Sequence, residues 1–160
     1  MDKDAEIFLK SLEEKRGGPI EWRTFCVFYA DSKGKICEHG VFLYEINKHF
    51  WFEDFEHLPQ LFGFQLPRPK HAAPYEKFEA DFGPEAVKEI RIVKKKSAVA
   101  FCKCNKKYEK LKAAGAITRL LCQCVTEIAL EDGTVLFFEL MDKTLENKIK
   151  QYKGVNNGSF

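Results

Sequence analysis

The sequence lacks three features that would assign it to a familiar class. It has no hydrophobic run close to the roughly 20 residues that a membrane-spanning helix requires. Its start, Met1-Asp2-Lys3-Asp4, has neither the basic flank nor the apolar core of a secretory signal peptide. It also has no glycine-rich phosphate loop and no G-x-S-x-G nucleophile elbow. We therefore expect a soluble intracellular protein that is not an enzyme and uses no cofactor.

The composition is that of a folded, aromatic-rich domain. A chain of 160 residues is long enough for one domain that buries about two-thirds of its unfolded surface. Hydrophobic residues make up 45% and charged residues 31%, which excludes a disordered or low-complexity chain. Aromatic residues reach 14%, and phenylalanine alone occurs fifteen times. Because aromatic residues favour strands and large cores, we expect a β-rich fold.

Apolar periodicity and turn residues predict how the chain is organised. Residues 1–18 are expected to form an N-terminal helix, 19–152 one β-rich domain with a proline-rich insertion at 59–84, and 153–160 a flexible tail. Strands are expected at 21–30, 41–46, 49–55, 90–93, 98–104, 118–125, 128–130 and 135–138, and helices at 5–15 and 142–152. Hairpin turns are expected at Asn47-Lys48 and, more strongly, at Asp132-Gly133. Short strands between two terminal helices predict a mainly β, α+β fold, arranged as a small barrel or sandwich.

Six cysteines are present, and four of them form two C-x-C pairs, Cys102/Cys104 and Cys122/Cys124. Without a signal peptide the thiols are expected to be reduced. On neighbouring strands the four side chains could converge on a zinc ion, although the spacing differs from the usual zinc knuckle. The simpler interpretation, which we favour, is that all four are metal-free and mostly buried as small hydrophobic residues.

The basic residues are concentrated in the segment 88–112. Ten lysines and arginines there face only Glu89 and Glu109, which gives a local net charge of +8 in a chain whose net charge is +2. The rest of the chain therefore carries −6. We expect partner binding by Lys94, Lys95, Lys96, Lys106, Lys107, Lys110 and Lys112.

Three interpretations of this basic segment stay open. It can be a solvated face with no partner, which is the fate of most charge runs. It can bind an acidic protein surface by electrostatic attraction. It can also bind RNA or DNA, with lysines on phosphates and aromatic rings on bases. Tyr108 is the only aromatic ring within 105–112, so the nucleic-acid interpretation is the alternative rather than the leading one.

Two stretches of the chain have a characteristic spacing. The first is Asp31-x-Lys33-Gly34-Lys35-x-Cys37-Glu38, followed by Leu43, Asn47-Lys48 and Pro59. The second is Asn105-Lys106, Lys110-x-Lys112 and Gly115-Ala116, which runs on to Asp132-Gly133. Together they resemble the Abitram family of actin-binding transcription modulators over roughly two-thirds of the chain.

The resemblance implies both a fold and a role. It implies a barrel-sandwich hybrid of short strands, similar to the lipoyl-carrier and glycine-cleavage H-protein folds. It also implies a non-enzymatic adaptor of the nucleus and cytoplasm that binds actin. The carrier folds attach a cofactor to a lysine within a Glu-Ser-x-Lys-Ala-like hairpin. Lys94, Lys95 and Lys96 lie outside such a setting, so no swinging arm is expected, and the oligomeric state stays open.

Overall fold

The protein is an α+β protein built on one large antiparallel sheet. The computed structural model describes residues 3–32, 36–54, 60–61, 64–65, 75–103, 111–140 and 143–156. The helices are α1 (Lys3–Arg16), α2 (Lys95–Lys103), α3 (Ala116–Leu121) and α4 (Thr144–Asn156), with a short 3₁₀ helix η1 (Pro84–Ala86). The strands are β1 (Trp22–Asp31), β2 (Ile36–Ile46), β3 (His49–Asp54), β4 (Gln60–Leu61), β5 (Phe64–Gln65), β6 (Glu79–Phe82), β7 (Val87–Lys94), β8 (Cys124–Leu130) and β9 (Val135–Glu139).

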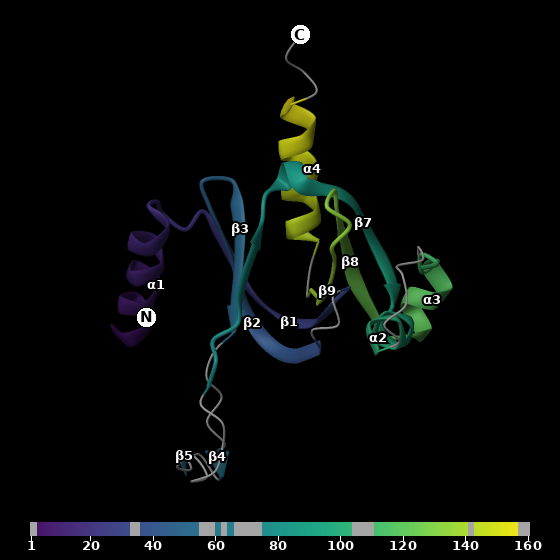
Figure 1. The fold of residues 1–160 in the computed structure, drawn as a ribbon, viewed down its shortest axis with the longest axis horizontal. Helices are drawn as coiled ribbons and strands as arrows, with labels where there is room; N and C mark the ends of the chain where they lie inside the picture. The colour runs from purple at the N-terminus through teal and green to yellow at the C-terminus, as the bar shows by residue number, and fades with distance from the viewer. Residues whose placement is uncertain are drawn as a thin grey trace.

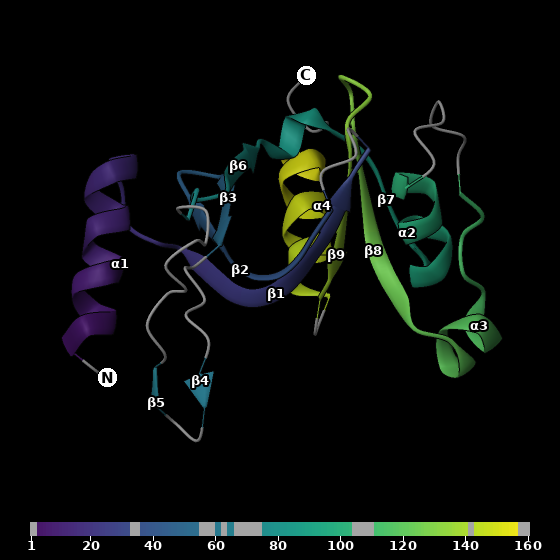
Figure 2. The same cartoon turned by 60° about the horizontal axis from the view of Figure 1, so that its bottom comes forward.

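Seven strands pair in the order β6-β3-β2-β1-β9-β8-β7, and β4 and β5 form a separate two-stranded sheet. The central strand β1 pairs with β2 on one side and with β9 on the other, so it joins the two halves of the chain. The large sheet is strongly curved, and α4 lies inside the curve (Figures 1 and 2). This arrangement gives the sheet a concave face that surrounds α4 and a convex face that carries α1 and α2.

The main core fills the concave face around α4. Leu145 and Ile149 of α4 are buried there with apolar side chains from seven strands and from the turn regions between them. The aromatic members are Phe28, Phe50, Phe52, Phe82 and Phe138, and Phe78 packs against them. Phe52 and Phe138 meet edge to face with ring centroids 5.0 Å apart. The phenylalanine-rich composition is therefore used to line the inside of a curved sheet.

Two helices cover opposite ends of the convex face (Figure 2). Leu12 of α1 packs in a small core with Phe42 and Tyr44 of β2. At the other end, Ala98 and Cys102 of α2 pack in a second core that includes strand residues from β1, β7, β8 and β9. The convex face thus has one helix at each end, and α2 is the one formed by the basic segment.

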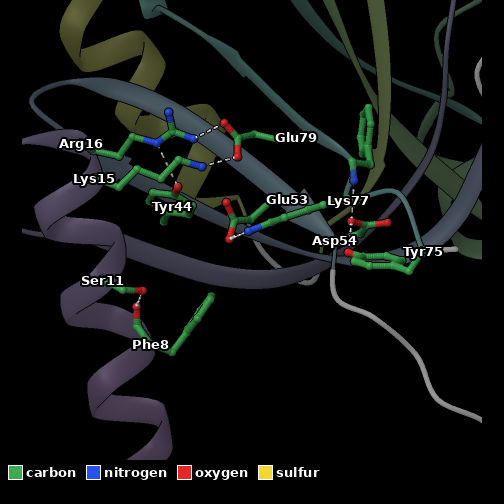
Figure 3. Close-up of polar contacts among 11 residues, drawn as sticks. Phe8, Ser11, Lys15, Arg16, Tyr44, Glu53, Asp54, Tyr75, Lys77 and Glu79 are labelled. Atoms are coloured by element: carbon green, nitrogen blue, oxygen red, sulfur yellow. Dashed lines mark hydrogen bonds and ion pairs between the residues drawn. The ribbon is translucent and has the colours of Figure 1, made fainter. Parts of the chain in front are cut away.

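Charged contacts fasten α1 to the sheet edge at β6 (Figure 3). Lys15 and Arg16, in the last turn of α1, each lie 2.5 Å from a different carboxylate oxygen of Glu79. The Arg16 guanidinium also lies 3.6 Å from the centroid of the Trp51 ring. Because Glu79 belongs to β6, these contacts tie the N-terminal helix to the outermost strand.

Both hairpin predictions and both terminal helices are confirmed. β8 and β9 pair through Asp132-Gly133, where Gly133 has a φ of +84°. β2 and β3 pair through Asn47-Lys48, whose φ values of 52° and 60° suit a tight hairpin. α4 continues to Asn156, so the first residues of the expected tail are helical. None of the described helices combines the length and the hydrophobicity needed to cross a membrane.

Two predictions of secondary structure are wrong. Residues 98–103 are helical rather than extended, since α2 spans Lys95–Lys103. Residues 118–121 are also helical, and the strand expected there begins only at Cys124. Both segments contain residues that favour strands. Such preferences do not by themselves determine the structure of a short segment, because its surroundings in the fold decide it. Within the proline-rich insertion expected at 59–84, strand β6 pairs with β3.

Candidate partner-binding site

The packing of α2 determines which lysines face outward. Ala98 and Cys102, four residues apart, are buried against the sheet, and the Phe101 ring lies 6.3 Å from that of Phe137. The opposite face of the helix therefore presents Lys96, Ala100 and Lys103 at helical spacing, and Val99 is half-buried at its side. The strand expected at 98–104 would place neighbouring residues on opposite faces, so it did not predict this grouping.

A groove of about 720 Å³ lies on this outward face of α2, and we name it the lysine groove. It is lined by Lys94, Lys95, Lys96, Val99, Ala100, Lys103, Cys122 and Gln123. Half of these residues are lysines, and none of the described lining residues carries a carboxylate. Lysine stems and two small apolar residues form its walls, while the ammonium groups supply the charge. Such a groove attracts acidic groups and offers them apolar contact as well.

The structure brings some of the predicted lysines together and not others. Lys94, Lys95 and Lys96 all line the groove, and Lys103, which the sequence did not single out, joins them. Lys112 is exposed but does not line it. Lys106, Lys107 and Lys110 lie outside the described residues.

Lys95 differs from its neighbours because its ammonium group already contacts side chains of the sheet. Its Nζ atom lies 4.2 Å from the centroid of the Tyr29 ring and 3.7 Å from a carboxylate oxygen of Glu139. Tyr29 in turn donates a hydrogen bond of 2.8 Å to the same Glu139 oxygen. Lys95 therefore anchors α2 to the sheet, whereas Lys94, Lys96 and Lys103 are exposed at the surface.

Residues 111–114 are fixed to the outer edge of β7. Arg91 of β7 donates a hydrogen bond of 2.8 Å to the carbonyl of Leu111 and pairs with the buried Glu127. The backbone N–H of Ala114 donates to the carbonyl of Ile92 at 2.7 Å, at the outer edge of β7. These contacts hold residues 111–114 against the sheet and so determine where α3 begins.

The cysteines do not form the arrangement that a zinc site on two strands would need. Cys102 lies in α2, where burial, with a smaller contribution from the charge of Asp31, raises the pKa of its thiol to about 11. Cys122 is exposed at the end of α3, so the expectation that it is buried is wrong. Cys124 is half-buried, and Cys104 lies outside the described residues. Within the described part of the chain, no three cysteine, histidine or acidic side chains are grouped closely enough to hold a metal ion.

Buried carboxylates elsewhere serve the fold rather than a site. Glu45 is fully buried on the concave side, where Tyr152 donates a hydrogen bond to it and Lys148 lies 2.8 Å away. Glu53 is fully buried beneath the segment that enters β6, and Lys77 pairs with it at 2.8 Å (Figure 3). Neither residue lines the lysine groove. Both carboxylates therefore hold helix or chain segments onto the sheet.

A second hollow, of about 510 Å³, lies where the β2–β3 turn meets α4. Its lining mixes Lys48 with Glu85 and neutral polar residues. Mixed charge gives it no preference for ligands of one sign, so the lysine groove is the better candidate.

Comparisons with known proteins do not assign a family or a function to this chain. No protein-family model, no curated protein and no solved structure matches this chain.

Proposed function

We propose that this chain is a non-enzymatic protein-binding adaptor that docks an acidic partner on the lysine groove. The observation that carries the proposal is the composition of the groove: four lysines and no carboxylate among its described lining residues. The whole chain has a net charge of only +2, so this concentration is local. Clustered like charges repel one another, and an acidic partner relieves that repulsion while accelerating the encounter.

The resemblance to the Abitram family narrows this proposal to actin as the partner and to the nucleus and cytoplasm as the location. It also implies that the fold is a barrel-sandwich hybrid, which is a more specific description than an α+β protein with a large antiparallel sheet. The described strands form two sheets of very unequal size, with seven strands in the larger one. The acidic-partner proposal depends on the groove alone and not on that finer description.

The second candidate function is RNA or DNA binding through the same lysines. What favours it is the sequence that follows Lys103 of the groove, because Lys106, Lys107, Lys110 and Lys112 add four more positive charges. Against it, the described lining of the groove has no aromatic side chain on which a base could stack. A protein partner is therefore the first choice.

Charge reversal within the groove is the direct test. The groove variant carries Lys94→Glu, Lys96→Glu and Lys103→Glu, and a control carries Lys3→Glu, Lys10→Glu and Lys143→Glu, which are exposed lysines outside the groove. Both variants change the net charge equally. Cosedimentation with actin should weaken about tenfold or more for the groove variant, because each lost rim pair contributes roughly 0.2–1 kcal/mol and reversal adds repulsion. The control should bind as the wild type does.

Salt dependence and a second probe separate the two functions. We expect reversal of Lys106, Lys107, Lys110 and Lys112 to slow association with the acidic partner without unfolding the chain.

Binding to a single-stranded RNA of about 20 nucleotides, measured at about 50 and 200 mM salt, should be weak. Strong RNA binding with a steep logarithmic salt slope would instead favour the alternative. A folded groove variant that keeps full affinity for every probe would show that the groove is a solvated face.

A further inference from the structure

Helix α3 exposes three large aliphatic side chains next to the lysine groove. Ile117, Leu120 and Leu121 are 75%, 84% and 75% exposed, and we name them the apolar ridge. No residue of α3 is buried. The helix lies beside α2 at one end of the molecule in both views (Figures 1 and 2). Neighbouring exposed aliphatic residues of this size are unusual on a soluble surface and indicate a contact surface.

The ridge and the groove meet where α3 ends. The last residue of α3, Leu121, is followed directly by Cys122 and Gln123, which line the groove. The backbone N–H of Lys95 donates to the carbonyl of Gln123 at 3.0 Å, so the start of α2 and the end of this segment are held together. Leu121 of the ridge therefore lies next to the lining of the groove, in which Val99 and Ala100 supply apolar surface and the lysines supply the charge.

We propose that the occupant of this surface is an acidic amphipathic helix of a protein partner. Its aliphatic face would pack against the apolar ridge and the groove floor, and its carboxylates would pair with Lys94, Lys96 and Lys103. An amphipathic helix in a groove satisfies both demands at once, since its apolar and charged residues lie on separate faces. This inference rests on the proposed function, and it adds the shape and apolar character of the partner's binding element.

Three other occupants fit the same surface less well. Nucleic acid gains little from aliphatic side chains, because its bases stack on aromatic rings. A second copy of this chain would bring two lysine-rich borders together, and the like charges would repel. A lipid surface is flat on the scale of one helix and would leave a groove of about 720 Å³ unfilled. Charge complementarity and concavity together therefore favour an acidic helix.

The test uses two peptides of identical composition, each about 18 residues long so that a helix can form. One places leucines at i, i+3, i+4 and i+7 with glutamates elsewhere, and the other has the same residues in scrambled order. The wild type should bind the amphipathic peptide about tenfold more tightly than the scrambled one, because truncation of central contacts typically costs a factor of this size. Isothermal titration calorimetry measures both affinities.

Three variants locate the effect. The ridge variant carries Ile117→Ser, Leu120→Ser and Leu121→Ser, and it should fold as the wild type does because all three residues are exposed. It should lose the preference for the amphipathic peptide but keep the weaker, charge-driven binding. A matched pair, Leu120→Ser and Ile7→Ser, compares two exposed aliphatic residues in different helices. Only Leu120→Ser should weaken binding, and circular dichroism melting checks that all variants are folded.

The remaining outcomes would overturn the inference in distinguishable ways. Equal affinity for both peptides, lost in the groove variant, would refute the amphipathic helix and leave the acidic partner standing. Binding of neither peptide would also refute the inference, while the actin assay would still test the proposed function. Ridge-dependent binding to phosphatidylcholine vesicles with about one-third phosphatidylserine, tighter than to the peptide, would assign the ridge to lipid. Ridge-dependent dimers in sedimentation would assign it to a second copy.

Discussion

At the scale of single residues, the pKa of the Glu79 carboxylate in β6 is strongly lowered. Hydrogen bonds from Lys15 and then Arg16 lower its pKa from the ordinary value of 4.5 to about 2. Both partners belong to α1, so the charge of Glu79 contributes to the docking of the N-terminal helix. Because the carboxylate is partly exposed, solvent screening makes its contribution smaller than the full pKa shift implies.

We predict that Glu79→Gln lowers the free energy of unfolding by about 1 kcal/mol at pH 7. A carboxylate with a lowered pKa stabilises the folded state above its unfolded-state pKa. The difference between wild type and variant should therefore be constant above about pH 5 and shrink as the pH falls from 4.5 towards 2. Urea unfolding at several pH values measures this difference. Glu76→Gln is the control, an exposed neighbour, and a similar loss there would contradict the assignment to Glu79.

Single residues of the site were only partly predictable. Lys94, Lys95 and Lys96 stood out because local charge is a property of the sequence itself. That Lys95 turns towards Tyr29 and Glu139 depends on residues far along the chain, so no local pattern could show it. The signal for a helix over α2 was nevertheless present, because Ala98 and Cys102 are four residues apart.

At the scale of elements, local chemistry predicted turns better than strand pairing. Asp132-Gly133 correctly predicted a hairpin, because the conformational preferences of these two residues favour a tight turn whatever their surroundings. The pairing of β1 with β9 joins segments more than a hundred residues apart, and nothing local specifies it. The sequence predicts one strand over 118–125, but 118–121 belong to α3 and only the residues from Cys124 onward form β8, because Leu120 and Leu121 suit a helix as well as a strand.

The element on which the core depends most is α4. Ile149 is buried on the concave face among the aromatic side chains of the sheet. We predict that Ile149→Ala lowers the free energy of unfolding by about 2–5 kcal/mol, since it removes buried methyl groups and leaves a cavity. Gln151→Ala, an exposed change in the same helix, should alter it by less than about 0.5 kcal/mol. Equal effects in thermal or urea unfolding would show that α4 is not held by the core described above.

At the scale of the whole molecule, charge and apolar surface are distributed unevenly. The lysine groove and the apolar ridge lie at the end occupied by α2 and α3, while α1 lies at the other end (Figure 2). The sequence showed the charge but not the ridge, because exposure of Ile117, Leu120 and Leu121 follows from how α3 is placed after residues 111–114. A surface of this kind exists only once the chain has folded.

The measurement that most directly tests the central claim is a titration of the ¹⁵N-labelled protein with the acidic amphipathic peptide, followed by amide chemical shifts. If the lysine groove and the apolar ridge form the docking site, the shifts should concentrate in residues 94–103 and 116–123. Amides of α1 should stay unchanged, and the groove variant should show no shifts at the same peptide concentrations. Shifts concentrated in α1 or at the β2–β3 turn, with residues 94–103 unaffected, would contradict the account.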